Sequence, residues 1–76
     1  MPRSLAAITR DIRKDWKNVY FGARPYLDAM GILDSVSDSF GYDSGKSIVL
    51  YFLSNASTWK GEVARRIKAE LKGMVK

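Results

Sequence analysis

The sequence predicts an all-α protein, a compact bundle of three to four short helices with a central buried helix. Segments 4–17 and 58–74 place apolar residues at steps of three and four, the spacing of an amphipathic helix. Segment 46–53 is apolar on every side, as expected for a helix at the centre. A chain of 76 residues supports only one small core, so we expect residues 1–76 to form a single domain.

The first expected helix covers residues 4–17 and begins at Ser4, whose hydroxyl suits an N-cap. Its apolar stripe consists of Leu5, Ile8, Ile12 and Trp16. Its outward face is basic and carries Arg10, Arg13, Lys14 and Lys17. Residues 18–23 then form a short apolar and aromatic piece that we interpret as a buried connector, with a short strand as the alternative.

A second helix is expected from Pro25, because the fixed φ and missing N–H of proline suit a first helical turn. Tyr26 or Leu27, Met30, Leu33 and Val36 continue the helical spacing. Segment 35–45, SVSDSFGYDSG, is rich in Ser, Asp and Gly and is predicted to be the main loop.

Segment 46–53 follows, and periodicity alone does not separate a buried helix from a buried strand there. We favour a helix capped by Asp43 or Ser44, because a lone strand would have no sheet to join. The last helix, 58–74, is expected to be capped by Ser57 or Thr58. Its apolar stripe is Trp59, Val63, Ile67, Leu71 and Met74, so both Trp16 and Trp59 are predicted to be core residues.

Composition argues against several classes of protein. There is no cysteine and no histidine, which removes disulfides and the common zinc sites, and we expect no metal and no cofactor. No nucleophile with a base and no pair of carboxylates in a pocket is visible, so we do not expect an enzyme. No run approaches the roughly 20 apolar residues that span a membrane, and the start lacks a secretory signal, so we expect a cytoplasmic protein.

Charge is divided between the ends and the middle of the chain. Residues 1–24 and 59–76 each carry a net charge of +4, whereas residues 25–58 carry −3. If the terminal helices pack side by side, their basic faces could merge into one patch that attracts nucleic acid or an acidic protein surface. The expected phosphate contacts are Arg10, Arg13, Lys14 and Lys17 on the first helix and Arg65, Arg66, Lys68 and Lys72 on the last. Ordinary solvated helix faces are the alternative.

Residues 41–47, GYDSGKS, are similar to the phosphate-binding loop G-x-x-x-x-G-K-[ST] but are one residue short. No strand is expected before Gly41, so nucleotide binding is not predicted. A looser expectation is that the N-terminus of the helix that follows, at Gly45, Lys46 and Ser47, holds one phosphate or carboxylate.

Segment 47–71 resembles the first two helices of winged helix-turn-helix DNA-binding domains. In that family an apolar helix and a polar turn precede an E-[LV]-A-R-R-[LI] stretch, present here as residues 62–67. The resemblance covers about a third of the chain, and the recognition helix and wing of that family are missing. It implies DNA binding.

Two functions are therefore expected. The first is a small basic helical module that binds nucleic acid, or acts on a nucleic-acid-associated complex, through the basic faces of its first and last helices. The alternative is a protein-interaction module, such as a homodimer, a small inhibitor or an adaptor. Its expected interface is formed by aromatic residues near the loops, namely Tyr20, Phe21, Phe40 and Tyr42.

Overall fold

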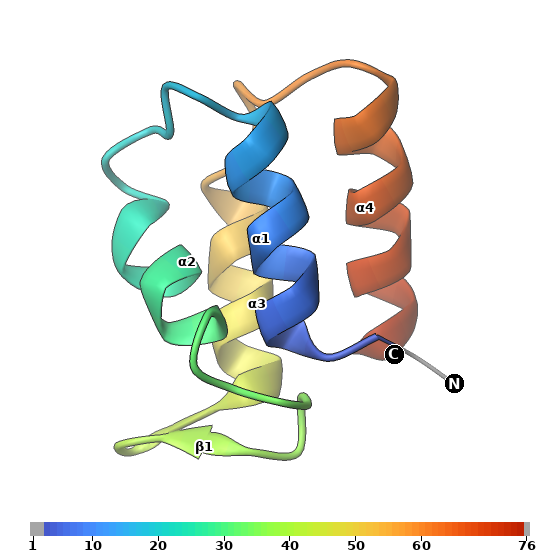
Figure 1. Ribbon diagram of the computed structural model, residues 1–76. Coiled ribbons are helices and arrows are strands. Elements are labelled where there is room, and N and C mark those ends of the chain that lie inside the picture. Colours follow the sequence, from blue (N-terminus) through green and yellow to red (C-terminus); the bar gives the residue numbers. More distant parts are fainter. Residues whose placement is uncertain (1–2, 76) are drawn as a thin grey trace.

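The computed structural model describes residues 3–75 and contains four helices and one small hairpin (Figure 1). The elements in chain order are α1 (Leu5–Asp15), α2 (Arg24–Met30), β1 (Ser39–Phe40), β2 (Asp43–Ser44), α3 (Gly45–Ser54) and α4 (Glu62–Met74). Helix α1 stands between α2 and α4, and α3 lies behind it. The radius of gyration is 11.1 Å, close to the roughly 11 Å expected of a compact chain of this length. The structure confirms a compact, mostly helical protein.

The start of α1 agrees with the prediction, because the Ser4 hydroxyl accepts a hydrogen bond from the N–H of Ala7 at 3.1 Å. The start of α4 does not agree with the prediction. Helix α4 begins at Glu62, after Gly61 at φ 113°, and the predicted caps Ser57 and Thr58 lie in the connection before it. Few residues other than glycine adopt such a φ, so the chain turns at Gly61 before the helix can start.

Helix α2 is shorter than predicted and ends at Met30. The predicted continuation to Val36 is wrong because the backbone beyond Met30 is used elsewhere. The carbonyl groups of Leu33 and Asp34 accept hydrogen bonds from the N–H groups at the start of α1, at 3.0 and 2.9 Å. These bonds satisfy donors that a helix start leaves free. They also hold the chain after α2 against α1.

The segment predicted as the main loop contains an antiparallel hairpin. Strands β1 and β2 pair Ser39 with Ser44 and Phe40 with Asp43, and Gly41 forms the turn at φ 63°. Helix α3 follows at once. The Ser44 hydroxyl accepts a hydrogen bond from the N–H of Ser47 at 3.1 Å, which confirms a helix rather than a strand and identifies Ser44 as its cap.

One core joins the four helices, and its centre is a cluster of aromatic rings. Trp16 and Trp59 are 7% and 2% exposed, and their rings stack at 5.6 Å with an interplanar angle of 7°. Phe52 of α3 packs edge-on against both. The prediction that both tryptophans are core residues is confirmed.

Two expectations about burial are corrected. Helix α3 buries one face, but Leu50 and Tyr51 are 44% and 49% exposed on its other side, so it is not enclosed all round. The connector 18–23 is buried only at Ala23, and Tyr20 and Phe21 project into solvent. The carbonyl groups of Tyr20 and Phe21 accept hydrogen bonds from the N–H groups of Ala23 and Arg24, so the backbone turns at these two residues. No helix within residues 3–75 is long and apolar enough to cross a membrane.

Candidate nucleic-acid interface

Helices α1 and α4 pack side by side (Figure 1), but the seam between them is acidic. Arg3 pairs with Asp11 of α1 and forms two hydrogen bonds to Glu70 of α4, at 2.8 and 3.1 Å. At the other end of α1, the indole N–H of Trp59 donates to Asp15 at 2.8 Å. We call Arg3, Asp11, Asp15 and Glu70 the α1–α4 seam. Three carboxylates and one cation make up this seam, so negative charge lies between α1 and α4.

The charges of the seam stabilise one another. Hydrogen bonds to Glu70 and Asp11 raise the pKa of Arg3 above its ordinary value. The hydrogen bond from Arg3 lowers the pKa of Asp11, and the charges of Lys14 and Arg10 lower it further. A lowered carboxyl pKa means that the fold favours the ionised form. This contribution to stability is present above the ordinary pKa and is lost as the pH falls through the lowered one.

A concave surface runs along one flank of α4. It is a shallow groove of about 540 Å³, which we call the α4 groove. Its lining residues are Trp59, Lys60, Gly61, Glu62, Ala64, Arg65, Lys68, Ala69 and Lys72. Four of these are cations and one is a carboxylate. Arg66 is absent from the lining, because each helical residue turns about 100° and carries Arg66 away from the flank of Arg65.

Lys68 lies deepest among the groove cations. Its ammonium group donates to the Trp59 carbonyl oxygen at 2.6 Å and sits 5.8 Å from the centre of the Trp59 ring. Burial lowers the pKa of Lys68, and the positive charges of Lys72 and Lys60 lower it further. The ion pairs within residues 3–75 are Arg3–Asp11, Arg3–Glu70 and Arg13–Asp28, so no groove cation has a carboxylate partner there.

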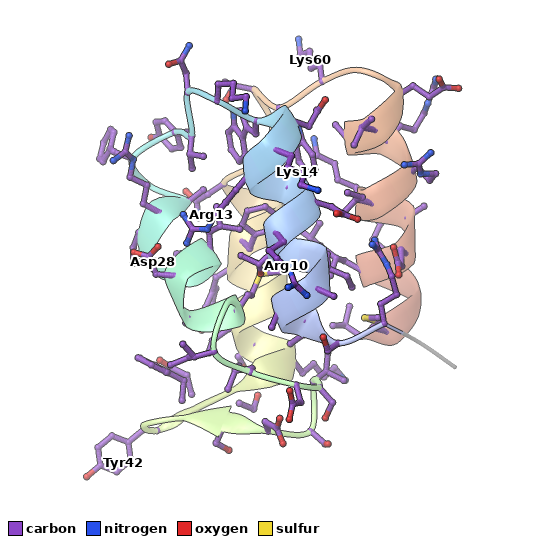
Figure 2. The ribbon with its side chains drawn as sticks, viewed as in Figure 1. Arg10, Arg13, Lys14, Asp28, Tyr42 and Lys60 are labelled. Carbon is purple, nitrogen blue, oxygen red and sulfur yellow. The ribbon has the colours of Figure 1, made fainter. Side chains whose placement is uncertain are left out.

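A second basic surface lies on α1. Arg10, Arg13, Lys14 and Lys17 are all exposed along one side of α1, and Figure 2 shows Arg13 leaning toward Asp28 of α2. Arg13 and Asp28 pair at 2.7 Å, but both side chains are half exposed or more, so the pair is weak.

A pocket of about 270 Å³ lies beside this face, and we call it the α1–α2 pocket. Its lining residues are Arg13, Trp16, Lys17, Val19, Arg24, Leu27 and Asp28. Arg24 is a site residue that sequence reasoning missed. Its position directly before Pro25, at the start of a helix, was the available signal.

The predicted anion site at the start of α3 lacks free donors. The N–H of Gly45 donates to the Asp38 carbonyl oxygen at 2.6 Å, that of Lys46 to the Val36 carbonyl oxygen at 3.1 Å, and that of Ser47 to the Ser44 hydroxyl. Gly45 is itself buried, and a Cβ there would lie 2.8 Å from the Ser35 carbonyl oxygen. These backbone N–H groups are therefore already used within the fold.

The aromatic residues of the alternative interface are all exposed, but they form two groups. Tyr20 and Phe21 lie between α1 and α2 with ring centres 4.8 Å apart. Phe40 and Tyr42 lie on the hairpin, where Tyr42 projects from the tip (Figure 2). Figure 1 places the two segments at opposite ends of the bundle, so no single aromatic patch forms.

Comparison with models of known protein families, with curated proteins and with solved structures finds no match for this chain. The resemblance to winged helix-turn-helix domains therefore gains no support. Residues 3–75 contain no cluster of three or more acidic side chains that could hold a metal ion. The two basic surfaces are the strongest candidates for a functional site.

Proposed function

We propose that this protein binds nucleic acid through the phosphate backbone, with the α4 groove as a contact surface. The observation that carries the proposal is the set of four cations in that groove, which have no carboxylate partner among residues 3–75. Burial lowers the pKa of Lys68, and repulsion from the charges of Lys72 and Lys60 lowers it further. Phosphate groups would supply the missing negative charge and relieve this repulsion.

The spacing of the cations suits a nucleic-acid backbone. Arg65 and Lys72 are separated by about 10 Å along the helix axis, at 1.5 Å per residue. A duplex carries one negative charge per roughly 1.7 Å, so about six phosphate charges lie along that length. Trp59 is only 2% exposed and lies under Lys68, which leaves no open ring for stacking on a base. The proposed binding therefore has little sequence preference.

Fluorescence anisotropy with a labelled DNA duplex tests the proposal. If the four groove cations contact phosphates, raising salt from about 50 to about 200 mM weakens binding roughly 100-fold. The two neighbouring arginines of α4 provide a matched pair of variants. Arg65→Ala removes a cation of the groove, and Arg66→Ala removes the same charge from outside it.

Arg65→Ala is expected to weaken binding and to reduce the salt slope by about 0.9, whereas Arg66→Ala leaves both nearly unchanged. Alanine favours helices, so neither variant is expected to unfold α4. Equal effects of the two variants would show that only net charge matters and that the groove is not the contact surface. Absence of binding at about 50 mM salt would overturn the proposal.

A second candidate function is protein binding through the hairpin. The observation in its favour is Tyr42, which is fully exposed at the tip of a turn that Gly41 holds at φ 63°. A large ring presented on a short hairpin is suited to fill a pocket of a partner, including a second copy of this chain. Sedimentation of the wild-type chain and of Tyr42→Ala tests self-association. A wild-type chain that stays monomeric at all concentrations would exclude the homodimer.

A further inference from the structure

We propose that one molecule of this protein holds two nucleic-acid duplexes at once. One duplex lies along the α4 groove, and the other lies on the basic side of α1 and its α1–α2 pocket. This inference rests on the proposed function and extends it from binding to bridging. The structural basis is the presence of two separate basic surfaces on one small protein.

The two surfaces share no residue and lie on either side of the tryptophan stack. Trp59 forms part of the wall of the α4 groove, and Trp16 forms part of the wall of the α1–α2 pocket. Their rings stack nearly parallel at 5.6 Å. The stacked pair therefore separates the two concave surfaces, and the two do not open into each other.

Each surface is basic enough to attract a phosphate backbone by itself. The α4 groove has four cations and the single carboxylate of Glu62. The α1–α2 pocket has Arg13, Lys17 and Arg24 with the single carboxylate of Asp28. Three cations against one carboxylate leave this pocket with a net positive charge.

One straight duplex is poorly suited to occupy both surfaces. A duplex laid across α1 and α4 would place its phosphates over Asp11, Asp15 and Glu70 of the seam, where like charges repel. A duplex that avoided the seam would have to bend around a protein whose longest dimension is 29 Å. The persistence length of duplex DNA is about 500 Å, so bending a duplex so sharply costs free energy. Two duplexes avoid both penalties.

A bridging assay tests the inference. One duplex is fixed to beads, a second carries a fluorophore, and the labelled duplex retained on the beads is measured with and without the protein. Two variants each lose three cations. The groove variant combines Lys60→Ala, Arg65→Ala and Lys72→Ala, and the pocket variant combines Arg13→Ala, Lys17→Ala and Arg24→Ala.

The wild-type chain is expected to retain the labelled duplex on the beads at low salt. Excess protein is expected to release it, because each duplex is then covered by its own protein molecules and none of them holds both. Each variant is expected to bind a single labelled duplex in anisotropy. The amount of labelled duplex retained on the beads is expected to fall about tenfold or more, because bridging requires both surfaces to be occupied together. Circular dichroism confirms that both variants are folded.

A mixture of the two variants separates bridging by one molecule from bridging by a dimer. In a dimer each copy would contribute its intact surface, and the mixture would recover bridging, which would overturn the inference. A mixture that stays inactive supports it. Binding without bridging by the wild-type chain would overturn this inference alone, whereas absence of any duplex binding would overturn the proposed function as well.

Discussion

Replacement of Trp59 by alanine should reveal how much of the fold depends on the tryptophan stack. The change removes a side chain that is 2% exposed, one ring of the stack with Trp16, and the hydrogen bond to Asp15. Truncation of a buried tryptophan typically costs about 3–5 kcal/mol. A domain of this length has a total free energy of unfolding of about 4–11 kcal/mol, so the variant is expected to lose a large share of it.

Urea denaturation followed by far-UV circular dichroism measures this loss, since tryptophan fluorescence itself changes in the variant. The thermal midpoint is expected to fall by about 12 °C or more. Tyr42→Ala is the control, because that aromatic ring is fully exposed and its removal is expected to change the free energy of unfolding by about 0.5 kcal/mol or less. A loss below about 1 kcal/mol for Trp59→Ala would refute the reasoning that the stack is a main support of the core.

Three further predictions concern two glycines and a lysine. Gly45→Ala is expected to destabilise the protein by about 1–3 kcal/mol, because its Cβ would lie 2.8 Å from a backbone oxygen. Gly73→Ala is expected to stabilise the protein by about 0.5–1 kcal/mol, because a Cβ there meets nothing within 4 Å. Thermal denaturation of the Gly45→Ala and Gly73→Ala variants compares the two sites. The lowered pKa of Lys68 disfavours its charged form, so this cost to stability is present at low pH and is relieved as the pH rises through the lowered value. Lys72→Ala is expected to raise that pKa in an NMR titration of the lysine side chains, and an unchanged pKa would show that the ammonium groups are not close.

On the proposed function, the opposite charges of the seam also affect which parts of the surface contact the nucleic-acid backbone. Asp11 and Glu70 hold Arg3, and they place negative charge between the two basic surfaces. On the proposed function, this arrangement would confine phosphate contacts to either side of the seam. A protein with the same net charge spread evenly would offer one broad surface instead, with no preference for two separate ligands.

Much of the local structure could be predicted from the sequence because it depends on neighbours along the chain. The apolar spacing of residues 5–16 identified α1, and the hydroxyl of Ser4 identified its cap. Pro25 marked the start of α2. The apolar run after Ser44 was predicted to be helical because no sheet was expected for it to join. The two tryptophans were assigned to the core because each lies on an apolar stripe.

Tertiary structure decided the features that depend on distant contacts. Helix α2 ends at Met30 because the carbonyl groups that follow it bind the start of α1, and Trp59 reaches the core from a connection rather than from a helix. The charge of each segment was readable from its residues, but which cations share a surface was not. That depended on how α1 and α4 are rotated about their axes. Packing brought Asp11 of α1 and Glu70 of α4 to the same arginine, Arg3, and Asp15 to the indole N–H of Trp59.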